Sequence, residues 1–234
     1  MPYTPAHLEH RGPSLLWVAL VYLGLSMGAL LAVLLAGAPY PSPFDAGSVL
    51  WFPQHEGTTR LFAFLMLGAS VPLGIFTATA VSRLRFLGVR VAGVDIAFFG
   101  GAAASIFTAL GALLAWVLAY APGVAAHSLH VLAFALGGVG ATVALGIFLA
   151  GGSLAAGLAG LVPRWLMWLG LVGAALCEIG SLTVLLNEVA YLLPLARLVA
   201  FVWIVALGAS LPKTRHPSDA TASRQPGWLV PETP

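Results

Sequence analysis

The chain has 234 residues, of which 60% are hydrophobic and only 8% are charged, and its mean hydropathy is +0.98. Because soluble domains carry roughly 25% charged residues, this composition excludes a soluble enzyme, a soluble binding module and a disordered chain. The net charge of +2 does not indicate a nucleic-acid partner, and the single Cys177 excludes a disulfide framework and a cysteine-based metal site. The sequence therefore predicts an all-α, polytopic membrane protein whose first partner is the lipid bilayer.

Six runs of the chain are apolar over enough residues to cross a bilayer, which takes about 20 residues in a helix. They are Ser14–Gly37, Thr59–Val81, Val91–Tyr120, His127–Ala150, Trp165–Asn187 and Leu195–Leu211. The Gly-rich segment Gly151–Val162, directly after the fourth run, is a candidate for a loop that dips into the membrane. We expect one transmembrane domain over residues 1–211 and a flexible cytoplasmic tail over residues 212–234, which are rich in Pro, Ser and Thr.

Positive charge is concentrated on one side of the predicted spans. The flanks on the side of both termini hold eight basic residues, and the opposite flanks hold two, Arg60 and Arg197. The eight are Arg11, Arg83, Arg85, Arg90, Arg164, Lys213, Arg215 and Arg224. Because basic flanks stay in the cytoplasm, the sequence predicts a multi-pass protein with both termini inside.

An internal repeat emerges when the chain is shifted by 72 residues. FAFLMLGASVPLGIFTA (residues 62–78) then aligns with FALGGVGATVALGIFLA (residues 134–150), and 10 of the 17 positions are identical. The repeated unit is a hairpin of two spans, so spans 2–3 and 4–5 are expected to be parallel copies related by an axis along the membrane normal. We expect them to form a four-helix core that meets at the small residues Gly68 and Gly140, with the first and sixth spans outside.

Three histidines are predicted to gather on the outer side. The repeat places His55 and His127 in equivalent positions, and His130 follows on the same helical face as His127. Histidines that face each other across an axis are typical ligands of haem iron, and His-x-x-His with Glu56 as a further ligand suits a divalent metal. The alternative is that these histidines are interface residues that bind no cofactor.

Glu178 is the most costly residue to place in the membrane, because the hydropathy pattern puts it near the middle of the fifth run. We expect it to be buried in the bundle interior, where it would relay protons or bind a cation. The alternative is a neutral carboxyl group that is hydrogen-bonded to a neighbouring hydroxyl or carbonyl group.

The remaining charged residues are predicted at the edges of the spans. Asp95 is within reach of Arg90 or of the Arg83 and Arg85 pair, and Glu56 is spaced to pair with Arg60 one helical turn later. Arg197 is expected to extend its side chain outward to the membrane surface.

The motifs SRLRFLGVRVAG (Ser82–Gly93), LVPRWLMWLGL (Leu161–Leu171) and LLPLAR (Leu192–Arg197) resemble those of a widespread set of uncharacterised bacterial inner-membrane proteins of about this length. The resemblance runs from about Phe62 to Pro212. It implies a bacterial inner membrane and six spans, and it supplies no activity and no site residues.

Three classes of function remain open. The first is a non-enzymatic accessory or scaffold subunit of a membrane assembly, whose partners would be other membrane subunits or further copies of the chain. The second is a haem- or metal-binding protein that uses His55 and His127, and the third is a small transporter or sensor with a site between the repeats near Glu178. The chain holds no nucleotide-binding loop, zinc-protease motif or nucleophile elbow, which disfavours an enzyme.

Overall fold

The fold is described from a computed structural model, which describes residues 8–37, 40–45, 48–121 and 124–215. Six helices are long and apolar enough to cross a membrane, as the sequence predicts. The helices are α1 (Leu15–Leu34), α2 (Ser48–Gln54), α3 (Glu56–Phe86), α4 (Ala92–Leu118), α5 (Val124–Ala133), α6 (Ala141–Leu158), α7 (Arg164–Gly180) and α8 (Leu192–Ser210). A π-helical segment, η1 (Phe134–Gly140), joins α5 to α6, and two 3-10 turns, η2 (Ser181–Val184) and η3 (Asn187–Tyr191), precede α8.

The helix α6 continues to Leu158, so the expectation of a dipping loop over Gly151–Val162 is wrong for most of that segment. Glycine is tolerated inside this helix because neighbouring elements pack directly on its backbone. A Cβ atom on Gly151 would lie 2.6 Å from the backbone nitrogen of Ala97, and one on Gly152 would lie 2.8 Å from the ring of Trp203. In a membrane, a helix also satisfies its own backbone hydrogen bonds, which a loop does not.

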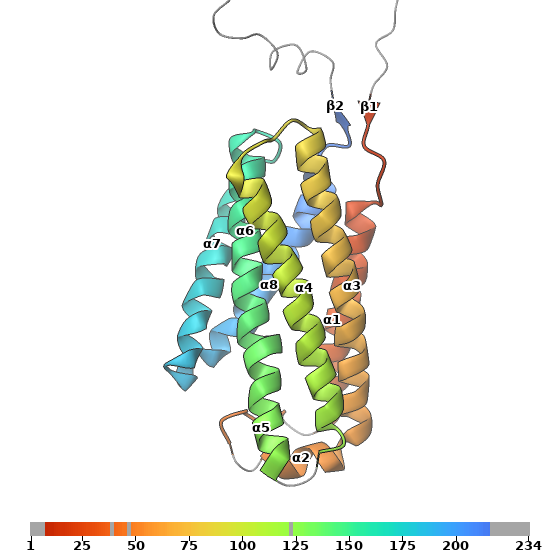
Figure 1. Cartoon of the computed structure of the whole chain (residues 1–234), viewed down its shortest axis with the longest axis vertical. Helices are drawn as coiled ribbons and strands as arrows, with labels where there is room; N and C mark the ends of the chain where they lie inside the picture. The colour runs from red at the N-terminus through yellow and green to blue at the C-terminus, as the bar shows by residue number, and fades with distance from the viewer. Residues whose placement is uncertain (1–7, 38–39, 46–47, 122–123, 216–234) are drawn as a thin grey trace, which may run out of the picture.

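The six spanning helices close into a ring in chain order. Each packs against the next, and α1 packs against both α3 and α8 (Figure 1). Three aromatic side chains fill the centre: the ring centroids of Phe76 and Phe148 lie 6.2 Å apart, and those of Phe148 and Trp203 lie 5.5 Å apart. The expectation that the first and sixth spans lie outside a four-helix core is therefore wrong, because α8 contributes Trp203 to the core and α1 contributes Leu15.

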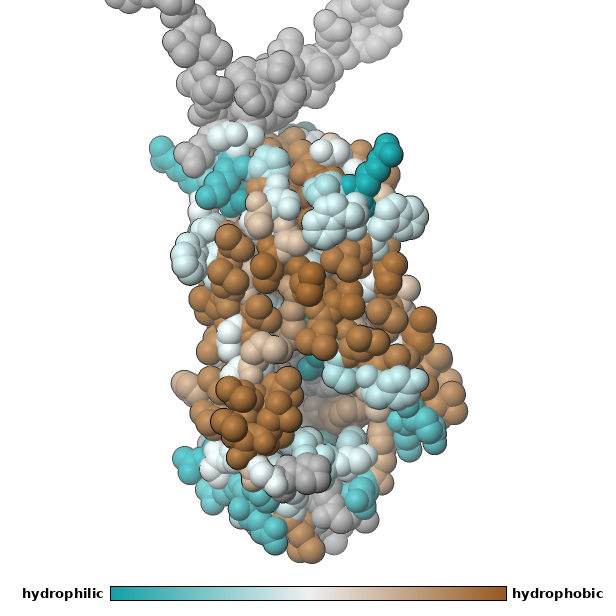
Figure 2. All heavy atoms as spheres, turned by 180° about the vertical axis from the view of Figure 1, so that it is seen from behind, coloured by the Kyte–Doolittle hydropathy of each residue, from teal (hydrophilic) through white to brown (hydrophobic). Residues whose placement is uncertain are grey.

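The face of the molecule in Figure 2 is apolar in the middle and more polar toward its two ends. Large apolar side chains such as Phe64, Phe99 and Ile106 are exposed on the spanning helices. Exposed apolar side chains on spanning helices contact lipid, so the structure and the composition together describe an integral membrane protein.

The helices α4 and α6 pack closely through glycines, which differ from those predicted. Cβ atoms on Gly100, Gly111 or Gly151 would collide with the backbone of the facing helix or of η1, whose Gly137 faces Gly111. Gly68, by contrast, faces Leu25 of α1, and Gly140 faces the ring of Phe107 on α4. The prediction that Gly68 and Gly140 bring the second and fourth spans together is wrong, because identity between repeats does not mark contact between them.

The two hairpin turns at the end that holds both termini have the same geometry. Gly88 and Gly160 follow α3 and α6 with positive φ values of 92° and 67°, and they are 72 residues apart. The amide after each glycine bonds back to a carbonyl five residues earlier, Val89 to Leu84 and Leu161 to Ala156, each at 3.0 Å. Such a left-handed helix end strongly favours glycine, and its recurrence at the repeat offset is what duplication of the hairpin predicts.

Gly88→Ala and Gly160→Ala should therefore destabilise the protein by about 1 kcal/mol each, because alanine is strained at positive φ. Thermal unfolding in detergent micelles measures the effect. Gly24→Ala is the matched control, since Gly24 lies inside α1 with open space beside it. Equal stability of all three variants would contradict the requirement for glycine at these turns.

The segments that precede α1 and follow α8 are joined by a short clasp at this same end of the bundle. The strand β1 (Leu8–Glu9) pairs antiparallel with β2 (Thr214–Arg215), and the amide of His10 bonds to the carbonyl of Lys213 at 3.0 Å. The imidazole of His10 hydrogen-bonds the hydroxyl of Ser82 on α3 at 3.0 Å. The first residues of the predicted flexible tail are thus paired, and residues 216–234 of that tail lie outside the described residues.

This clasp should weaken as the pH falls. Burial, with the nearby Arg83 as the smaller cause, lowers the pKa of His10 below its ordinary value of 6.5. The closed clasp therefore favours neutral His10. The stability that the His10 contacts give the clasp is complete above about pH 6.5. It is lost as the pH falls below that value, because the open clasp binds the proton more readily than the closed one. We expect faster hydrogen exchange at the His10 amide at pH 5.5 than at pH 7.5 after correction for intrinsic rates, and a much smaller difference in His10→Gln.

Candidate functional site

The histidines predicted as ligands do not form a three-ligand metal group. His55 precedes α3, where its ring stacks on Trp51 at 4.3 Å and its Nδ1 lies 2.9 Å from the carbonyl oxygen of Trp51. His130 is buried against the rings of Tyr40 and Phe52, while His127 is only partly buried. Among the residues that the structure describes, no three His, Cys, Asp or Glu side chains, Glu56 included, are grouped to hold a metal ion. Haem binding by His55 and His127 stays a prediction.

Glu178 lies on the outside of the bundle and not in its interior. The buried stripe of α7 consists of Leu166, Gly170, Gly173, Ala174, Cys177 and Gly180. Glu178 directly follows the buried Cys177, so it lies beside this stripe and not in it. Its side chain is exposed, and one of its carboxylate oxygens lies next to Gly146 of α6. Because α7 ends at Gly180, Glu178 is also closer to a helix end than the hydropathy pattern indicates.

The predicted ion pairs at the edges of the spans are present. Arg85 pairs with Asp95 at 2.5 Å, and Arg60 pairs with Glu56 at 3.3 Å across one turn of α3. All four side chains are about half exposed or more, so each pair contributes little to stability.

Arg197 is the one strongly polar side chain that the structure places inside the wall of the bundle at the end where α2 and α5 lie. The prediction that Arg197 extends outward to the membrane surface is wrong. Its side chain turns inward from α8 toward η1. Its Nε donates to the hydroxyl of Thr142 at 3.1 Å, and its Nη2 donates to the carbonyl of Gly138 at 3.1 Å and to that of Gly137.

The π-helical segment explains why these carbonyl groups can accept a side-chain donor. In a π-helix the backbone bonds run from residue i to i+5, and single π turns inside α-helices are often found at functional sites. Gly137 and Gly138 carry no side chains, so their carbonyls are accessible to the guanidinium group. The site thus depends on a Gly–Gly pair on one span and an Arg on another, 59 and 60 residues apart in the chain.

A cavity of about 330 Å³ lies beside Arg197, within the half of the bundle that carries α2 and α5. Its walls come from α1, α3, α4, α5, η1, η3 and α8, and they are apolar except near Tyr40, Thr108, His130 and Arg197. Figure 2 shows that the back face of the molecule is hollowed in this half. The cavity has the size, about 300 to 1,000 Å³, and the mainly apolar lining of small-molecule sites.

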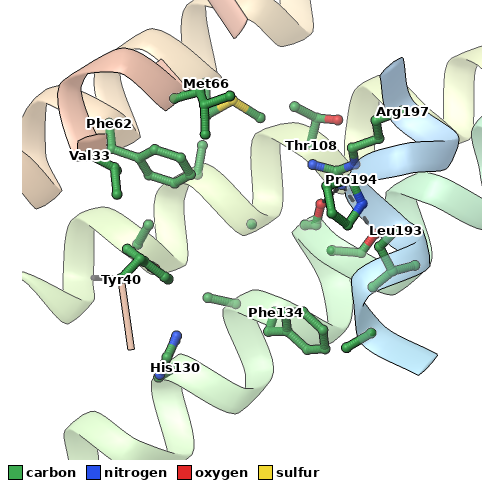
Figure 3. A pocket seen from close by; sticks show the side chains of 18 residues that line it. Val33, Tyr40, Phe62, Met66, Thr108, His130, Phe134, Leu193, Pro194 and Arg197 are labelled. Carbon is green, nitrogen blue, oxygen red and sulfur yellow. Dashed lines mark hydrogen bonds between the residues drawn. The ribbon is translucent and has the colours of Figure 1, made fainter. Parts of the chain in front are cut away.

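The polar groups of the cavity lie at separate ends. Figure 3 shows Arg197 beside Thr108 and Pro194 at one end, and His130 beside Tyr40 at the other. His130 is 2% exposed, and its Nδ1 has no hydrogen-bond partner among the described residues. Tyr40, from the segment between α1 and α2, covers His130 with ring centroids 5.6 Å apart. The cavity therefore has a cationic end and an aromatic end, with Phe62 and Phe134 along its walls.

The sequence contained part of this site but not its arrangement. The sequence predicts His130 as a metal ligand and Arg197 as a surface cation, and it gives no prediction for Tyr40 or for the Gly137–Gly138 pair. The sequence signal for the site is the single Arg197 inside an apolar run, because charged residues within a membrane-spanning segment normally face the interior of the bundle.

Comparison with known proteins gives no relative to guide the assignment: no family model, no curated protein and no solved structure matches the chain.

Proposed function

We propose that this integral membrane protein is a non-enzymatic binding protein that holds a small apolar or amphipathic molecule in the cavity beside Arg197. The observation that supports this proposal most directly is the cavity of about 330 Å³, whose walls are apolar and whose few polar groups lie at its two ends. A binding role of this kind fits a carrier or sensor, although at a place different from the predicted site near Glu178.

We further propose that the protein lies in a bacterial inner membrane with both termini in the cytoplasm. The support is the distribution of charge, because Arg85, Arg90, Arg164 and Lys213 lie at the end that holds the clasp. In this orientation the cavity opens in the outer half of the membrane. An accessory or scaffold role with partner subunits stays a prediction, since no feature of the described residues favours it over ligand binding.

Photolabelling of the protein in nanodiscs of zwitterionic lipid tests the proposed function. The probe is an octanol derivative that carries a diazirine, which is apolar, neutral and small enough for the cavity. We expect saturable labelling that unlabelled octanol competes away, with the adducts on η1 and on the first turns of α8. Labelling that does not saturate and that lies on lipid-facing residues such as Phe64 and Phe99 would contradict the proposal.

A further inference from the structure

Arg197 is a cation whose partners in the structure are all neutral. Its three hydrogen bonds go to a hydroxyl group and two carbonyl groups. The ion pairs of the described part of the chain are Arg60–Glu56 and Arg85–Asp95, neither of which includes Arg197. A charge inside a membrane protein pairs either with an opposite charge or with backbone carbonyl groups. Arg197 has carbonyl and hydroxyl partners only, so no anion among the described residues neutralises its positive charge.

The guanidinium group retains donors for such an anion. Arginine has five N–H donors in a planar fork, and here Nε and Nη2 are engaged while Nη1 has no partner among the described residues. The three existing hydrogen bonds hold the plane of the group in place, so little side-chain freedom remains to be lost when an anion binds. Arginine forks match the geometry of carboxylate and phosphate oxygens.

The cavity places this cation at one end of an apolar space. None of the described residues that line the cavity is acidic, and its walls between the two ends are formed by side chains such as Val33, Phe62, Met66 and Phe134. Figure 3 shows Phe62 and Met66 on one side, and Phe134 on the other, of the space that separates Arg197 from Tyr40. A molecule with one anionic group and one apolar chain is complementary to both parts.

The volume of the cavity selects among such molecules. At about 330 Å³ it lies at the lower end of the range of small-molecule sites, about 300 to 1,000 Å³. A single chain of medium length fits within this space, whereas the two acyl chains of a phospholipid would have to extend beyond it.

We propose that the ligand is a single-chain carboxylate, whose carboxylate group pairs with Arg197 and whose chain extends toward Tyr40. This inference rests on the proposed function, since it names the chemical class of the ligand of the same cavity. The carboxylate supplies the counter-ion that the chain lacks, and the walls of the cavity replace water around the apolar tail.

Competition against the octanol photoprobe tests this inference at neutral pH, where octanoate is ionised. Octanoate should displace the probe from the wild-type protein at a concentration about tenfold lower than octanol, because charge-assisted hydrogen bonds to a carboxylate are the stronger ones. Methyl octanoate, which has the same chain but no charge, should lack this advantage. Arg197→Gln should remove the advantage of octanoate over octanol. Arg60→Gln, which removes an exposed cation at the same end of the bundle, should keep both the advantage of octanoate and the binding of octanol.

The outcomes separate the two proposals. If octanol binds and octanoate binds no better, the inference fails and the proposed function stands; if neither binds, the proposed function fails as well. Should Arg197→Gln not fold, the comparison of octanoate with methyl octanoate on the wild-type protein still decides. A further arm adds phosphatidylglycerol to the nanodiscs: displacement of the probe by this lipid, without an advantage of octanoate, would assign the anion site to a lipid headgroup and overturn the inference.

Discussion

Gly111→Ala should destabilise the protein by about 2–3 kcal/mol, the upper part of the range for overpacked interiors. The added methyl group would collide with the Cα atom of Gly137, which belongs to the backbone of η1 and cannot move aside as a side chain can. Helices in membranes associate through close packing of small residues, since lipid supplies no hydrophobic drive between them. Unfolding in mixed micelles with increasing SDS measures the loss.

Gly68→Ala is the control for this experiment, because it makes the same change at a glycine of the repeat. Its Cβ would lie 3.6 Å from a methyl group of Leu25, an ordinary contact, so we expect a change within about 0.5 kcal/mol. Equal destabilisation by Gly68→Ala and Gly111→Ala would contradict the packing of α4 against η1 and α6.

Ala133→Phe should reduce binding of the octanol photoprobe by about tenfold or more, which corresponds to about 1.4 kcal/mol or more of binding free energy. Ala133 lines the cavity at the end of α5, and a phenyl ring there would occupy space that the ligand needs. The concentration of probe that gives half-maximal labelling is the measured quantity.

Ala135→Phe provides the matched control on the same helix. Ala135 is exposed on the outside of the bundle, where a phenyl ring contacts lipid and leaves the cavity unchanged. Binding that falls equally in both variants would indicate a general effect on the helix, and binding that is unchanged in both would place the probe elsewhere.

The spanning helices could be predicted from the sequence because hydropathy alone decides which segments cross a bilayer. The positions of α1 and α8 in the ring could not, since hydropathy gives no information about which apolar face meets which neighbour. The glycines of α4 were visible as a stripe of small residues at Gly93, Ala97, Gly100, Ala104 and Gly111. The identity of Gly68 with Gly140 reflects similarity between the hairpins and carries no information about which helices are in contact.

The candidate site was less predictable than the fold. The spacing of His55 and His127 indicated convergence, but His55 is held by Trp51 and turns to a local partner. The direction of Arg197 depends on the π-helical segment, which has no recognised sequence pattern and which exposes carbonyls on another span. The position of Glu178 could not be predicted, because hydropathy indicates neither the face of the helix nor that α7 ends at Gly180.

The methyl resonances of the methionines offer the most direct test of the cavity as a ligand site. Met66 lines the cavity, whereas Met27 and Met167 lie elsewhere on α1 and α7. The protein is labelled with ¹³C at the methionine methyl groups, and the signal that disappears in Met66→Leu is assigned to Met66. Octanol is then titrated into nanodiscs that hold the wild-type protein. We expect a saturable shift of the Met66 resonance, little change at Met27 and Met167, and loss of the Met66 shift in Ala133→Phe. A Met66 resonance that does not move, or shifts of all three that grow together without saturation, would contradict ligand binding in this cavity.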